Sequence, residues 1–174
     1  MSRKMGTQVS IAINGDSGAV SLCGRANVSC SVVFKSLLEH LRAEPIKEIF
    51  LFLESCVIMD STFLGVLANQ GARDSGQGGK VSITLVSPSE RVLGLIENLG
   101  VLDSFTVVEG HPNAAQFVFQ EVTLDAENDF TELTRTSLEA HRTLIDLNEA
   151  NRARFEGVTT LLAKELEDHE KSKN

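Results

Sequence analysis

Alternating apolar and polar positions in the first part of the chain predict a sheet with a hairpin and a buried strand. Residues 9–13 and 19–23 both alternate apolar with small or polar side chains, and the five residues between them are turn formers. Two such runs joined by a turn are typical of a β-hairpin. Residues 49–53 are apolar on both faces, which predicts a strand in the middle of a covered sheet.

Helical spacing replaces this alternation in the segments that follow. Residues 29–43 place apolar side chains along one face, and Asn27 or Ser29 is positioned to cap this helix. Residues 61–75 repeat the pattern, and the glycine-rich stretch 76–79 ends it. Strand-like runs follow both segments, so helices and strands alternate along this part of the chain.

A third helix is expected after the strand-like residues 80–86. Ser87 fits its N-cap, Pro88 fits its first helical position, and Glu90 fits the reciprocal capping role. Gly100 ends the helix, as glycine commonly does.

The remaining part of this region predicts one more strand and one more helix. Residues 105–108 are expected to form a short strand, and residues 111–120 a short helix. The order is two strands, then helix and strand in alternation, then helix. This order predicts an α/β fold, with a mixed β-sheet packed with α-helices.

The chain changes character after about residue 124. Residues 125–129 are acidic and loop-like, and amphipathic helices are expected over residues 133–147 and 155–166. The residues between these helices, 148–154, are almost wholly polar and interrupt any heptad register. A helical hairpin is therefore expected rather than one long coiled coil.

The predicted organisation is an α/β domain over residues 1–122 and a C-terminal α-helical extension over residues 123–174. The apolar stripes of the extension must be buried somewhere. One interpretation is packing on the sheet or helices of the same chain. The other is a homodimer that forms through the C-terminal helices.

Charge and composition narrow the class of function. The 174 residues carry a formal charge of −8 and contain neither Trp nor Tyr. Direct nucleic-acid binding is not expected, because it usually needs a basic surface and aromatic stacking residues. Membrane binding is disfavoured as well. The three cysteines are scattered, so we expect reduced thiols rather than disulfides. The sequence shows no apolar run typical of a signal peptide or a membrane span, which predicts a cytoplasmic protein.

No catalytic or metal-binding constellation is visible in the sequence. The four histidines have no metal-ligand spacing, and we expect them on the surface. Residues 76–80 end in Gly-Lys and faintly resemble a phosphate-binding loop, but they follow a helix and precede a strand, the reverse of what such a loop needs. A nucleotide-hydrolysing enzyme is the least supported class, and neither a cofactor nor a metal is expected.

The most informative stretch joins the central strand to the second helix, over residues 56–67. Asp60 and Ser61 stand there at the positions of an N-cap and a first-turn residue. Both residue types are favoured at helix starts, so capping alone is one explanation for them.

The surrounding residues add a second explanation. Residues 59–67, Met-Asp-Ser-Thr-Phe-Leu-Gly-Val-Leu, resemble the signature of the STAS domain, the family of bacterial anti-sigma factor antagonists. The order of elements is similar too: a hairpin over residues 9–24, a buried strand leading into Asp-Ser over residues 49–61, and a strand followed by a Ser-Pro-started helix over residues 81–102. The resemblance covers roughly residues 8–120 and implies a STAS-like mixed sheet packed with helices.

The resemblance also implies a regulatory site. In antagonists of this type the serine after the aspartate is phosphorylated; here that residue is Ser61, with Thr62 as the neighbouring hydroxyl. The unmodified domain is expected to bind an anti-sigma factor that is a serine kinase. Phosphorylation ends that binding, and a phosphatase restores it. The residues implied in partner binding are Asp60, Thr62, Phe63, Leu64, Arg25 and Asn27.

Three departures from the family pattern bear on this switch. Phe63 stands where a glycine is common, and either narrows access to Ser61 or anchors the partner. Phe52 takes a strand position often held by aspartate. Residues 25–27, Arg-Ala-Asn, replace an acidic loop that neighbours the phosphosite in the family. The alternative is therefore a constitutive STAS scaffold, which does not switch and assembles through its C-terminal helices.

Overall fold

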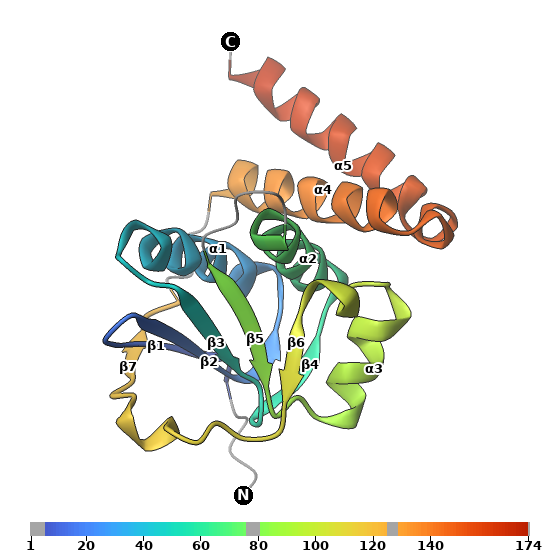
Figure 1. The fold of residues 1–174 in the computed structure, drawn as a ribbon. Helices are drawn as coiled ribbons and strands as arrows, with labels where there is room; N and C mark the ends of the chain where they lie inside the picture. The colour runs from blue at the N-terminus through green and yellow to red at the C-terminus, as the bar shows by residue number, and fades with distance from the viewer. Residues whose placement is uncertain (1–5, 76–80, 125–128, 174) are drawn as a thin grey trace, which may run out of the picture.

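A computed structural model describes residues 6–75, 81–124 and 129–173. Within these ranges a sheet carries three α-helices, and two further helices form the C-terminal end (Figure 1). The glycine-rich end of the second helix, the Gly-Lys sequence and most of the acidic segment after residue 124 lie outside the described residues. None of the helices described is both long and apolar enough to cross a membrane.

A seven-stranded sheet forms the base of the fold. The predicted hairpin is confirmed: β1 (Gln8–Asn14) and β2 (Ser17–Ala26) pair antiparallel. Next to β2 lie β3 (Glu48–Phe52), then β5 (Ser82–Val86), then β6 (Thr106–Val108), all parallel. The strand order is β6-β5-β3-β2-β1-β7, and the sheet is mixed, as the sequence predicts.

Two short strands are missing from the sequence-based prediction. β4 (Cys56–Met59) pairs parallel with the end of β2, and β7 (Gln120–Val122) pairs antiparallel with β1. Strands this short show no clear alternation in the sequence. The helix expected over residues 111–120 is wrong, because only the 3-10 turn Ala114–Gln116 forms there before the chain extends into β7.

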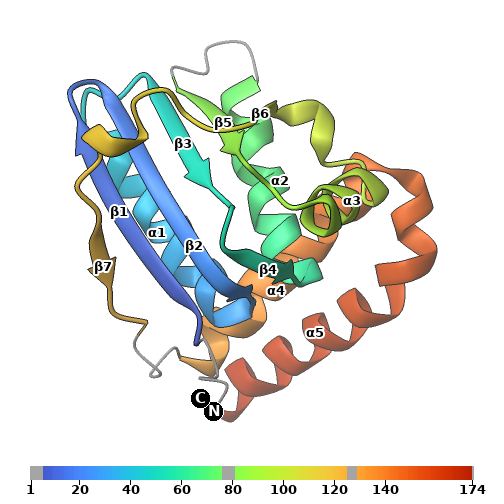
Figure 2. The ribbon, with the colours of Figure 1, turned by 90° about the horizontal axis from the view of Figure 1, so that it is seen from below.

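Four of the five helices described are stacked in layers on one face of the sheet, and the third helix lies at its side (Figures 1 and 2). The helices next to the sheet are α1 (Val28–Ala43), α2 (Ser61–Ser75) and α3 (Glu90–Asn98). Above them, α4 (Phe130–Leu147) crosses α1 and α2, and α5 (Arg152–Ser172) packs against α4. The predicted helical hairpin is present, with a short turn at Glu149–Asn151, and α4 buries its apolar stripe on the same chain.

The third helix begins later than the sequence predicts. Ser89 is the N-cap of α3, because its Oγ accepts a hydrogen bond from the N–H of Val92 at 3.2 Å. Ser87 was expected in this role but has a left-handed φ of 51°, and its Oγ accepts from the N–H of Gly110 at 2.9 Å. Ser87 therefore holds the loop after β6, and Pro88 precedes the helix instead of opening it.

Both faces of the sheet are covered at β3, as its apolar run predicts. Ile49 and Leu51 belong to the main core between the sheet and the helices. Phe50 and Phe52 point to the opposite face, where they pack against Phe117 from the segment before β7. Packing on this outer face accounts for a phenylalanine at position 52.

Candidate functional site

The N-termini of α1 and α2 meet at the edge of the sheet where the parallel strands β2 and β4 end. The N–H of Asp60 donates to the carbonyl oxygen of Ala26 at 3.0 Å and so joins the two strand ends. Asn27 is the N-cap of α1, since its Oδ1 accepts from the N–H of Cys30 at 3.1 Å. The two segments expected at the site, one before each helix, are therefore neighbours.

Asp60 is the N-cap of α2. Its Oδ1 accepts from the N–H of Phe63 at 2.8 Å, and its carbonyl oxygen accepts from the N–H of Leu64 at 3.0 Å. The residue is exposed overall, but its carboxyl group is partly withdrawn from water between the two helix ends. This desolvation raises the pKa of the Asp60 carboxyl, against the opposing effect of backbone N–H groups from Phe63, Val28 and Thr62.

Ser61 occupies the first turn of α2, and its hydroxyl group contacts a histidine of α4. Ser61 Oγ lies 2.9 Å from Nε2 of His141, a residue that is 5% exposed. The other ring nitrogen, Nδ1, lies 2.7 Å from the carbonyl oxygen of Ser137. Because a carbonyl oxygen only accepts, Nδ1 carries the proton in the neutral ring, and the Ser61 hydroxyl donates to Nε2.

A serine hydroxyl bonded to an imidazole is also how nucleophilic serines are activated in enzymes. In this chain, however, the imidazole of His141 is buried, and the ring of Phe155 from α5 packs on it with centroids 5.0 Å apart. The pair lies beneath a helix rather than in an open cleft. The arrangement therefore fits a hydroxyl that is held in place better than a hydrolytic site.

Helix α4 approaches α2 closely beside this contact. A Cβ added at Gly65 would overlap the backbone carbonyl of Ala140, so glycine is what permits the two helices to pack at this distance. Thr62 Oγ1 and Ser137 Oγ lie 3.0 Å apart, and Thr62 is only 6% exposed. The first two turns of α2 are thus covered by α4.

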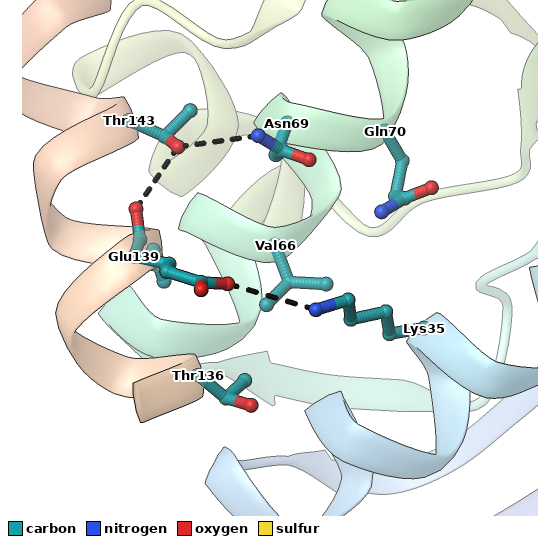
Figure 3. Close-up of a pocket in the computed structure, with 8 residues that line it drawn as sticks. Lys35, Val66, Asn69, Gln70, Thr136, Glu139 and Thr143 are labelled. Atoms are coloured by element: carbon teal, nitrogen blue, oxygen red, sulfur yellow. Dashed lines mark hydrogen bonds and ion pairs between the residues drawn. The ribbon is translucent and has the colours of Figure 1, made fainter. Parts of the chain in front are cut away.

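Polar contacts continue this interface away from Ser61 (Figure 3). Lys35 of α1 reaches Glu139 of α4, with Nζ 3.6 Å from Oε2, and Asn69 of α2 donates to Oγ1 of Thr143 at 3.5 Å. Among these residues lies a cavity of about 20 Å³, which has room for about one water molecule. The interface of α4 is therefore partly polar, as contacts between separable parts of a protein commonly are.

The other residues implied in partner binding have different surroundings. Phe63 and Leu64 are buried, and the Phe63 ring lies 4.9 Å from that of Phe34. In this structure both residues pack the core beneath α2 and present no surface to a partner. Arg25 and Asn27 are exposed, and Asn27 serves as a cap as well.

Sequence reasoning missed the contact between Ser61 and the C-terminal helix. The expectation that all histidines lie on the surface is wrong for His141, which stands on the buried face of α4, three residues after Leu138 and four before Ile145. That spacing was an available signal. Gly65 was another, because a glycine inside an apolar helical pattern often has a packing reason.

The three cysteines are free, and Cys30 and Cys56 are buried. Burial raises the pKa of Cys30 to about 12 and also raises the pKa of Cys56, so neither thiol ionises at neutral pH. In the part of the chain that the structure describes, no group of three or more His, Cys, Asp or Glu side chains could hold a metal ion.

Two substitutions at Asp60 test its role as a cap. Asp60→Ala removes the acceptor for the N–H of Phe63 and is expected to lower the free energy of unfolding by about 1 kcal/mol. Asp60→Asn keeps an acceptor and removes a carboxylate whose pKa is raised, so stability at pH 7 should be unchanged or higher. Urea denaturation measures both. Equal losses would mean that the negative charge, rather than the cap, stabilises this helix end.

Comparison with known proteins bears on the fold. Neither protein-family models nor curated proteins match this sequence. The anti-sigma factor antagonist SpoIIAA, solved in its unphosphorylated form, matches with a TM-score of 0.50 and 14% identity, over 63% of this chain and 92% of SpoIIAA. A Thermotoga maritima protein assigned as an anti-sigma factor antagonist matches with a TM-score of 0.50 and 22% identity, over 60% of this chain and 88% of that protein. The chain therefore has the fold of the anti-sigma factor antagonists, the STAS-like α/β fold that its sequence predicts.

Proposed function

We propose that this chain is an anti-sigma factor antagonist that acts by partner switching, with Ser61 as its phosphorylation site. The observation that carries the proposal is the position of the Ser61 hydroxyl, on the first turn of α2 in a chain with the fold of SpoIIAA. The unmodified chain binds an anti-sigma factor with serine kinase activity. The phosphorylated chain releases it, and a phosphatase reverses the change.

The phosphoryl transfer needs no catalytic group from this chain. The kinase moves the γ-phosphoryl group of ATP to Ser61 Oγ: a P–O bond forms there, the bond to the bridging oxygen of the β-phosphate breaks, and ADP leaves. The hydroxyl proton passes to a base of the kinase. Thr62 is a poorer phosphoryl acceptor than Ser61, because it is more deeply buried and its hydroxyl is hydrogen-bonded to that of Ser137.

A phosphate on Ser61 is compatible with the core of the domain. It would stand at the N-terminus of α2 and near that of α1, where free N–H groups and the helix dipole favour negative charge. It would add a charge of about −1.5 to −2 beside Asp60. A partner docked on α2 would have to desolvate this charge, and a penalty of about 3 kcal/mol already weakens a complex about 100-fold.

The first test of the proposal identifies the phosphorylated residue. The full chain is incubated with ATP and the serine kinase fraction of its own cell, and the product is analysed by mass spectrometry. We expect phosphate on Ser61 and none on the Ser61→Ala variant. Ser55→Ala is the matched control, because Ser55 lies exposed in the turn between β3 and β4, and its phosphate level should equal that of the unaltered chain.

The second test measures binding to that kinase. Ser61→Asp and the phosphorylated chain should bind at least about 100-fold more weakly than Ser61→Ala. If Ser61 carries no phosphate, and Ser61→Asp binds as well as Ser61→Ala, the chain is not a switch. A constitutive scaffold that assembles through its C-terminal helices would then describe it better.

A further inference from the structure

Helix α4 covers the surface that a kinase or partner has to reach. His141 contacts Ser61, Ser137 contacts Thr62, and Ala140 lies against Gly65. Figure 1 shows α4 running across α2, with α5 on its far side. Ser61 is half-buried, so a protein that acts on its Oγ has to break the contact with His141 of α4.

The contact with α4 depends on the hydroxyl proton of Ser61. In the neutral ring of His141 only Nε2 accepts, because Nδ1 donates to the Ser137 carbonyl. Once Ser61 Oγ is esterified it has no proton to donate, and the hydrogen bond is lost. His141 is buried, so its unpartnered nitrogen then destabilises the closed arrangement.

The phosphate also needs space that the closed arrangement does not offer. The helices are so close one turn further on that not even a methyl group fits at Gly65. A phosphoryl group brings three oxygen atoms and a charge of about −1.5 to −2. The Asp60 carboxylate at the same helix end has the same sign of charge.

We infer that α4 is a cover that weakens partner binding to α2 in the unmodified chain, and that the Ser61 hydroxyl holds it closed. A phosphate on Ser61 releases this cover, while the charge of the phosphate keeps the partner from the uncovered surface. The inference rests on the proposed function, which supplies the phosphate. Since α4 is attached, it competes with a partner at an effective concentration in the millimolar range. If the surface were uncovered in about 1% of molecules, the partner would bind about 100-fold more weakly than to the uncovered chain.

The interface has the composition of a reversible cover. It contains an ion pair, a side-chain hydrogen bond and a small cavity beside its apolar contacts (Figure 3). Of the buried residues of α4, four are small or polar and three are large and apolar: Thr134, Thr136, Ala140 and His141 as against Leu138, Leu144 and Ile145. Release of α4 therefore breaks polar contacts as well as apolar ones.

Hydrogen–deuterium exchange of the full chain tests the release without any partner. Phosphoserine is incorporated at position 61 during translation, so the test needs no kinase. We expect the amides of α4 to exchange at least about ten-fold faster than in the unmodified chain, and those of β2 and β3 to be unchanged. Phosphoserine at position 55, in an exposed turn, is the control and should leave α4 unaffected.

A steric wedge opens the same interface by a second route. Ala140→Leu adds bulk against Gly65 and leaves α2 itself unaltered, so it should also speed exchange in α4. Ala153→Leu, at an exposed position of α5, makes the same chemical change and should have no such effect. If Ala140→Leu fails to fold, the comparison of α4 exchange with phosphoserine at position 61 and at position 55 still tests whether phosphate releases α4.

Unchanged or slower exchange of α4 with phosphate on Ser61 would overturn the inference. Slower exchange would mean that a protonated His141 pairs with the phosphate and tightens the cover. Either result leaves the proposed function standing, because partner release is measured separately. Conversely, the exchange experiment still shows whether phosphate on Ser61 releases α4 even if no kinase modifies the chain, because the phosphoserine is incorporated during translation.

Discussion

Phe63→Ala is expected to lower the free energy of unfolding by about 3–5 kcal/mol. The Phe63 side chain is 0% exposed, belongs to the main core and packs its ring against Phe34 from α1. Truncation removes the apolar contacts and leaves a cavity between α1, α2 and the sheet. The surrounding helices cannot close this cavity fully because the sheet fixes their positions. Urea denaturation measures the loss.

Phe130→Ala is the matched control for this substitution. Phe130 is 51% exposed on α4 and contacts His169 only at the surface, so its truncation should change stability by less than about 1 kcal/mol. If Phe63→Ala kept its stability and instead lost binding to a partner, Phe63 would be a partner anchor, one of the two explanations offered for this departure from the family pattern.

Asn151→Asp is expected to produce the second large loss, of about 3 kcal/mol. Asn151 is fully buried in the turn between α4 and α5, where Nδ2 donates to the carbonyl oxygens of Leu99 at 3.0 Å and Leu144 at 2.8 Å. An aspartate would direct an oxygen, and a buried charge, at two acceptors. Thermal and urea denaturation of the full chain measure the effect.

Asn148→Asp provides the same chemical change three residues earlier. Asn148 caps the turn through its Oδ1, which accepts from the N–H of Ala150 at 3.0 Å. Aspartate fills such a cap as well as asparagine, so stability should stay within about 0.5 kcal/mol. A similar loss in both variants would show that added negative charge in this turn, and not the lost donors of Asn151, is responsible.

Local patterns were sufficient for most of the fold. The hairpin, the strand at Glu48–Phe52 and the cap at Asn27 depend on alternation, composition and turn chemistry within a few residues. The cap at Ser89 was missed because Ser87 satisfies the same sequence rule. Only the contact of Ser87 with Gly110, which the sheet brings near, decides between the two serines.

The sequence predicted only part of the candidate site, because the rest depends on a contact between segments that are far apart in the chain. Asp60 and Ser61 at the start of α2 follow from the sequence, but the partner of the Ser61 hydroxyl lies 80 residues further on, in α4. An amphipathic pattern says that α4 buries one face, without saying which helix it meets. The close contact between Gly65 and Ala140 determines that α4 packs on α2. This contact depends on the shapes of both helix surfaces together, so neither segment predicts it alone.

The distance of 80 residues between Ser61 and His141 also sets an order of events during synthesis. A ribosome adds about 5–20 residues per second, so His141 follows Ser61 after about 4–16 s. During this interval, and until α4 leaves the ribosomal tunnel, the hydroxyl of every newly made chain is uncovered. A kinase that acts on nascent chains would therefore meet an open substrate, whereas a kinase that acts on finished chains would meet a closed one.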